Sequence, residues 1–158
     1  AFQANLWASE AHFRRSDYDK AFGALGRAKD TLAASDELRD LMLDDFLRAC
    51  YEQAVAHRDA GSAALSVELL TLALAALPAP GGPQGNAGVG CNAGPIAAVR
   101  SRLMRQLALS YSELPDRELA LVHAREAVAL APPLSAHHVL SLQVLLRTLC
   151  GSQVPAEA

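Results

Sequence analysis

One segment of the chain, residues 101–134, has a spacing of small residues that restricts what it can fold into. Ala120, Ala124 and Ala127 recur at intervals of four and three residues, which places them on one face of a helix. Pro132 ends that helix, because proline cannot continue its backbone hydrogen bonding. A stripe of small side chains lets a second helix approach closely, so the segment predicts a tightly packed pair of helices.

The matching stripe lies on the helix that comes before it. Leu107 and Ala108 are followed one turn later by Tyr111. We expect Pro115 in the first turn of the second helix, where its missing N–H is tolerated, with Asp116 favouring the positive end of the helix dipole. The whole segment resembles the tetratricopeptide repeat (TPR), a helical hairpin of about 34 residues.

Two weaker copies of this pattern lie upstream, one starting near Phe2 and the other near Leu47. His12 and His57 stand where the first helix of a TPR usually carries Tyr. Because the three starts are unevenly spaced, a strict array is excluded. The resemblance implies an all-α fold, a right-handed α-solenoid of antiparallel helix pairs. The irregular spacing and long helices are similar to those of Spo-type meiotic-crossover TPR proteins and of some large regulatory ATPases.

Helix starts and stops divide the chain further. Ser35 or Asp36 is expected to cap a long uninterrupted helix, Ser135 to cap the last one, and Ser16 with Asp19 to form a capping box. The predicted helices cover residues 2–14, 17–34, 36–60, 62–77, 96–112, 116–130 and 136–149. One structural domain is expected, with helix pairs at 1–78, a flexible Gly/Pro-rich loop at 79–95, a pair plus terminal helix at 96–150, and a disordered tail at 151–158.

Composition narrows the function classes. Ala and Leu dominate, which favours helices, and a net charge of −3 favours neither nucleic acid nor an anionic membrane. The apolar stretches 65–77 and 139–149 are shorter than the about 20 residues that a membrane span requires. The glycines around Val89 lack the Gly-Lys-Ser/Thr of a phosphate-binding loop. We therefore expect no membrane partner, no direct nucleic-acid partner and no nucleotide cofactor.

Cys50, Cys91 and Cys150 show no metal-binding spacing and are odd in number. We expect free thiols and hence an intracellular protein, cytoplasmic or nuclear. Asp40 and Asp44 lie one turn apart and could share a cation, but a metal site needs more ligands in fixed geometry. The acidic stretch from Asp36 to Asp45 is better explained as a complement to the helix dipole.

Three further features have alternative interpretations. Arg100, Arg102 and Arg105 either recognise carboxylate groups of an acidic peptide or form a solvated face. Trp7, the single tryptophan, is expected in the core, with a binding hot spot as the alternative. The last predicted helix is apolar nearly all round, so either further chain covers it or it binds a partner. Because the chain opens without Met on a helical pattern, we expect a fragment of a longer solenoid.

The TPR resemblance implies a non-catalytic scaffold that binds a protein or peptide and belongs to a larger assembly. Its concave groove would be lined by the first, third and fifth helices, and no cofactor, metal or catalytic residue is expected. The alternative is a helical regulatory or small-ligand-binding domain, or part of an enzyme that uses the groove as a pocket. The carboxylate clamp of some TPR domains is disfavoured, because Leu6 and Glu10 occupy its positions. The candidate partner-binding residues are Asn5, His12, Tyr51, Arg102, Arg105 and Gln106.

Overall fold

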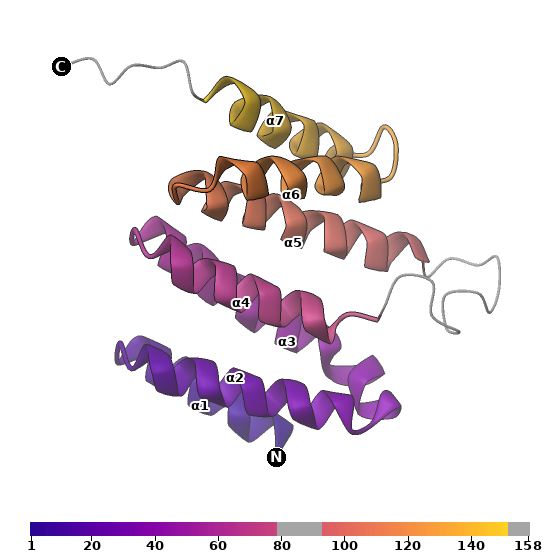
Figure 1. Ribbon diagram of the computed structural model, residues 1–158. Coiled ribbons are helices and arrows are strands. Elements are labelled where there is room, and N and C mark those ends of the chain that lie inside the picture. The colour runs from indigo at the N-terminus through magenta and orange to yellow at the C-terminus, as the bar shows by residue number, and fades with distance from the viewer. Residues whose placement is uncertain (79–92, 152–158) are drawn as a thin grey trace. The chain divides into compact units, whose positions relative to one another are not determined.

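The computed structural model describes the backbone of residues 1–78 and 93–151. This part of the chain contains seven helices and no strand, which confirms the all-α prediction. The predicted disordered tail from 152 onward and most of the predicted loop, residues 79–92, lie outside the described residues. The helices divide into two compact units, Ala1–Ala76 and Leu77–Ala158 (Figure 1).

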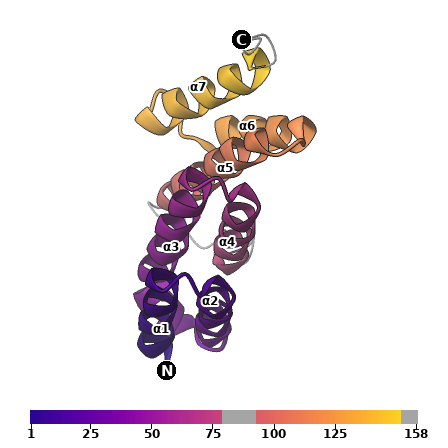
Figure 2. The same cartoon turned by 90° about the vertical axis from the view of Figure 1, so that its left-hand side faces the viewer.

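The first unit contains α1 (Phe2–Arg14), α2 (Tyr18–Ala33), α3 (Asp36–Asp59) and α4 (Ala63–Ala76). The closest packing joins α1 to α2 and α3 to α4, and further contacts join α1 to α3 and α2 to both α3 and α4. Within this unit, α1 and α3 lie side by side in one layer while α2 and α4 form the other (Figure 2). One face of α1 and one face of α3 therefore share a surface.

Small and branched apolar side chains fill the space between these layers. Helix α2 contributes one continuous stripe to it, and α3 adds Phe46 and Cys50. Leu41, an apolar residue of the same helix, lies outside this core and is 69% exposed. The α2 side chains of this core are Ala21, Ala24, Leu25, Ala28 and Leu32.

The local signals at the helix ends are confirmed in part. The Ser35 hydroxyl accepts a hydrogen bond from the Leu38 amide at 3.3 Å, so Ser35 caps the long helix as expected. The predicted capping box before α2 does not form. Ser16 adopts a left-handed backbone with φ 61°, and Asp17 takes the N-cap position without a capping hydrogen bond from its side chain.

The second unit contains α5 (Ala93–Glu113), α6 (Arg117–Leu130) and α7 (Ala136–Cys150). Helix α5 begins before the predicted Ile96. Its first turn includes Pro95, which is tolerated there because the first amides of a helix have no intrahelical acceptor.

The alanine stripe of α6 packs as predicted. Ala120, Ala124 and Ala127 are fully buried, and Leu107 and Ala108 of α5 are buried as well. This close approach allows a hydrogen bond between the helices, in which the Ser101 hydroxyl donates to the Ala127 carbonyl at 2.7 Å, and the ring of Tyr111 stacks on His123.

Helix α6 begins at Arg117, one residue after the predicted start at 116. Pro115 precedes the helix instead of lying in its first turn, because Asp116 is the N-cap and its carboxylate accepts from the Leu119 amide at 3.1 Å. At α7, the predicted cap is confirmed, since the Ser135 hydroxyl accepts from the His138 amide at 3.1 Å.

Candidate functional site: the hollow between α1 and α3

The shared face of α1 and α3 is hollowed into an open site of about 530 Å³. Its α1 wall uses positions spaced by three and four residues, from Gln3 to Arg14, and its α3 wall does the same from Asp45 to Gln53. Each wall is therefore one helical stripe. The side chains that line the hollow are Gln3, Leu6, Trp7, Glu10, Phe13, Arg14, Asp45, Arg48, Ala49, Glu52 and Gln53.

Trp7 is the largest exposed side chain of this site. Core packing was expected for it, but Trp7 is 68% exposed, so that expectation is wrong. The reason lies in the helical register, because Phe2 and Ser9 define the buried face of α1 and Trp7 lies about 140° round the helix from Phe2. Trp7 also lines a second, more open hollow with Glu10, Ala11, Arg14 and Arg15, so it contributes to both.

A buried polar contact forms part of the site and holds its two walls together. The side-chain amide of Gln53 on α3 donates to the hydroxyl of Ser9 on α1 at 2.9 Å, and both residues are buried. Nearer the start of α1, the Gln3 amide lies 3.4 Å from the sulfur of Met42. These contacts fix the spacing of the walls.

Charged side chains form the rim of the site. Glu10 pairs with Arg14 along α1, and Asp45 pairs with Arg48 along α3 at 2.6 Å. All four side chains are substantially exposed, so these pairs contribute little to stability and a partner's charges can compete for them. Glu52, the remaining charged lining residue, is also exposed.

A cluster of three rings closes the far end of this face. The imidazole of His57 on α3 is buried. Its centroid lies 5.2 Å from that of the Phe13 ring on α1 and 4.5 Å from that of the Tyr18 ring on α2. Loss of hydration on burial lowers the pKa of His57 below 6.5, so His57 is kept neutral. His57 thus joins three helices through packing.

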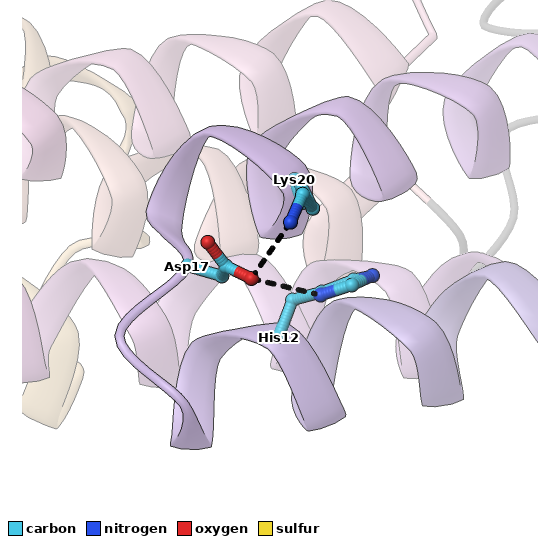
Figure 3. A network of polar contacts seen from close by, with 3 residues as sticks. All are labelled: His12, Asp17 and Lys20. Atoms are coloured by element: carbon cyan, nitrogen blue, oxygen red, sulfur yellow. Dashed lines mark hydrogen bonds and ion pairs between the residues drawn. The ribbon is translucent and has the colours of Figure 1, made fainter.

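His12 belongs to a polar network on the side of α1 that meets α2 (Figure 3). One carboxylate oxygen of Asp17 accepts from Lys20 at 3.0 Å and lies 3.8 Å from Nδ1 of His12. The hydrogen bond from Lys20, together with its charge, lowers the pKa of Asp17. This network anchors the turn between α1 and α2 and does not line the hollow.

The other candidates in the first unit also lie outside the hollow. Asn5 is half-buried and accepts from the Arg27 guanidinium at 3.5 Å, and Tyr51 is half-buried on α3. Leu6 and Glu10, which the TPR template placed at groove positions, do line it. The sequence analysis did not select most of the other lining residues as candidates. Each wall is a helical stripe that mixes apolar, polar and charged side chains, so neither stripe stands out in the sequence by its hydrophobicity or its charge.

The three candidates in the second unit have different environments. Arg102 is exposed and Gln106 is half-buried. Arg105, expected on a groove surface, is only 7% exposed, and its guanidinium donates to the His137 carbonyl at 3.4 Å and the Ser141 hydroxyl at 3.5 Å. The arginines of α5 are therefore not one exposed cluster, because α7 covers Arg105.

The described residues contain no group of three or more His, Cys, Asp or Glu side chains that could hold a metal ion. In the acidic stretch of α3, Asp36 pairs with Arg39 and Asp45 with Arg48, and Asp36 lies in the first turn.

Over the same described residues, we find no helix with both the length and the apolar character needed to cross a bilayer. In comparisons with known proteins, no family model, no curated protein and no solved structure matches this chain.

Proposed function

We propose that this chain is a non-catalytic interaction scaffold built from TPR-like helix pairs, and that its first unit binds a peptide or helix of a partner protein in the hollow between α1 and α3. The observation that carries the proposal is the exposure of Trp7 on the wall of that hollow. Tryptophan is enriched among residues that dominate binding energy, because one rigid ring buries a large apolar area.

The order of contacts supports antiparallel pairing within the second unit. Ser101, near the start of α5, bonds to Ala127 near the end of α6, whereas Tyr111, near the end of α5, stacks on His123, which comes earlier in α6. Contact positions that rise along one helix and fall along the other are those of an antiparallel pair. A TPR hairpin has this arrangement.

Contacts in the first unit support side-by-side stacking of successive pairs. Gln3 meets Met42, Ser9 meets Gln53, and Phe13 meets His57. Positions rise along both helices, so α1 and α3 run in the same direction, as the first helices of neighbouring solenoid repeats do. Their shared face corresponds to the concave face of a solenoid, which is where such proteins bind their partners.

The character of the hollow favours a protein partner over a small substrate. Pockets for small ligands are concave and mostly apolar, and they bury most of the ligand. This hollow is open, has charged side chains on both walls, and carries Trp7 on its α1 wall. Neither His12 nor His57 lines it. The exposed ring of Trp7 can contact an apolar side chain of a peptide, while the charged side chains around it contact the polar backbone of the same peptide.

Site-specific photo-crosslinking in cell extract tests this proposal. A photoreactive amino acid replaces Glu52 inside the hollow, or Glu68, an exposed residue of α4, as the control position, and captured proteins are identified by mass spectrometry. We expect a protein that is captured from position 52 only and is lost when Trp7→Ser is added. Identical captures from both positions, or capture unaffected by Trp7→Ser, would contradict the proposal. Extracts of cytoplasm and nucleus are compared, since we place the protein in one of these compartments.

A further inference from the structure

The charged side chains on the α3 wall of the hollow lie at two distances from α1. Gln53 of α3 and Ser9 of α1 bond to each other inside the contact between the two helices, so the angle round α3 from Gln53 measures how far a side chain lies from that contact. At about 100° per residue, Asp45 and Glu52 lie about 80° and about 100° from Gln53, and Arg48 lies about 140° from it in the same direction. The two carboxylates of this wall are therefore closer to α1 than its guanidinium is.

The α1 wall has the same order. Glu10 lies about 100° round α1 from Ser9 and Arg14 about 140°, again in one direction. Exposure agrees with this order on both walls. The Glu10 side chain is 57% exposed and that of its partner Arg14 76%, while the Asp45 side chain is 41% exposed and that of its partner Arg48 68%. The paired carboxylates thus lie further inside the hollow than the guanidiniums.

The hollow also has an excess of one negative charge. Three carboxylates line it, those of Glu10, Asp45 and Glu52, but only two guanidiniums, those of Arg14 and Arg48. Glu10 pairs with Arg14 and Asp45 with Arg48, whereas Glu52 has no ion pair within the described residues. If Arg48 turns to Glu52, Asp45 is left instead, so the excess is one carboxylate in either arrangement. A cation from a partner can therefore bind here without displacing a guanidinium.

Apolar side chains lie between these carboxylates and the contact of the two helices. Ala49 is about 40° from Gln53 on α3 and Leu6 about 60° from Ser9 on α1, and both are half-buried lining residues. Lysine and arginine have a long apolar stem below a charged end, and they bury the stem on apolar surface while the charge stays near water. A basic side chain therefore matches both levels of the hollow, whereas an acidic side chain would meet like charge.

We propose that the segment bound in the hollow is basic, with a lysine or arginine close to the apolar side chain that meets Trp7. The stem of that residue packs on Leu6 and Ala49, and its cationic end lies among the three carboxylates. An arginine forms the stronger contact, because its planar guanidinium can bond two carboxylate oxygens at once. This inference rests on the proposed function, since it specifies the chemistry of the segment that the same hollow binds.

The test starts from peptides that use the hollow. Random peptides displayed on phage are selected against the full chain at low salt, synthesised with a fluorescent label, and measured by anisotropy against the parent and Trp7→Ser. Peptides that Trp7→Ser weakens are the occupants of the hollow. We expect each of them to carry a lysine or arginine at a constant spacing from an apolar residue, and their affinity to fall as salt rises.

Replacement of the basic residue tests its charge. Citrulline has the shape of arginine without its charge, so each peptide is made with arginine or with citrulline at the basic position. We expect the citrulline peptide to bind the parent about tenfold more weakly, the loss expected when a hydrogen bond loses its charged partner. Equal binding of the two peptides would overturn the inference.

Variants of the chain locate the cation. Glu52→Gln removes the excess carboxylate and is expected to weaken the arginine peptides about threefold, as the loss of an exposed ion pair does. Arg48→Gln raises the excess to two carboxylates and should strengthen the same peptides, a change that damage to the fold would not produce. Glu68→Gln is the matched control, because it makes the same change of charge as Glu52→Gln at an exposed position of α4 and should bind as the parent does. Circular dichroism verifies that each variant remains helical.

Failure of this inference differs from failure of the proposed function. The effect expected of Glu52→Gln is small, so photo-crosslinking from position 52 can still succeed. If the peptides weakened by Trp7→Ser share no basic residue, or bind Glu52→Gln and Glu68→Gln equally, the inference of a basic segment is overturned while the hollow remains a peptide site. If Trp7→Ser weakens no selected peptide, both are overturned.

Discussion

Gln53 on α3 donates its side-chain amide to the hydroxyl of Ser9 on α1 across 2.9 Å, inside the contact between the two walls of the hollow. Both residues are buried, so water cannot replace either partner without a local opening of the unit. A buried amide that loses its acceptor costs more free energy than the hydrogen bond itself contributes, because its hydration is already lost. The pair therefore couples the geometry of the hollow to the stability of the first unit.

Removal of one partner should be more damaging than removal of both. We expect Ser9→Ala to lower the free energy of unfolding of the first unit by about 1–3 kcal/mol, because it leaves the Gln53 amide unsatisfied. Ser9→Ala/Gln53→Leu should regain part of this loss, since an apolar side chain then fills the same place. Native-state hydrogen exchange of α1 and α3 reads the local stability. A double variant that is no more stable than Ser9→Ala would show that the two residues are not coupled in this way.

Much of the helical content could be predicted from the sequence, because helix starts and stops are local. Ser35 and Ser135 cap their helices by bonding to amides three residues on, and the uninterrupted stretch from Asp36 forms one helix to Asp59. The alanine stripe of α6 was predictable for the same reason, since its spacing alone defines a face. These features depend on residues within one or two turns of each other.

The side of each helix that becomes covered was harder to predict. Trp7 and Leu41 are large and apolar, yet both are exposed because neighbouring helices pack against other faces of α1 and α3. Arg105 is charged, yet α7 covers it and offers a backbone carbonyl and a hydroxyl to its guanidinium. Such outcomes depend on which helices meet, and a single sequence contains only a weak signal of that.

His57 makes the first unit sensitive to acid. Burial lowers the pKa of His57 below 6.5 in the folded chain, whereas the unfolded chain keeps a pKa of about 6.5. Above pH 6.5 the imidazole is neutral in both states and stability is at its full value. As pH falls through about 6.5, the unfolded state takes up the proton first, so stability is lost until the pH passes the lowered folded pKa.

Hydrogen exchange of α1, α2 and α3 at a series of pH values checks this expectation. His57→Phe keeps a ring against Phe13 and Tyr18 and should remove the part of the acid sensitivity that His57 supplies. His12→Gln serves as the control, since His12 lies on a partly exposed network and not in the ring cluster. An acid sensitivity that persists unchanged in His57→Phe would contradict the assignment to this residue.

The two described cysteines should react at very different rates. Cys50 is buried, and loss of hydration raises the pKa of its thiol to about 12, so almost no thiolate forms at neutral pH. Cys150 lies exposed at the end of α7. We expect a maleimide to label Cys150 rapidly at neutral pH and to reach Cys50 only after denaturant is added, as read by peptide mass spectrometry. Rapid labelling of Cys50 in the native chain would mean that the core of the first unit is open.

Selection of peptides on the intact chain tests the central claim most directly. A library of random peptides is displayed on phage, selected against the chain, and the selected peptides are measured for affinity to Trp7→Ser and to Leu41→Ser. Leu41 is the matched control, because it is as exposed as Trp7 in the same unit and does not line the hollow. We predict that Trp7→Ser weakens the selected peptides by more than about thirtyfold, the loss expected of a binding hot spot, while Leu41→Ser has little effect. Selected peptides that bind Trp7→Ser as tightly as the parent would contradict the assignment of the hollow between α1 and α3 as a peptide-binding site.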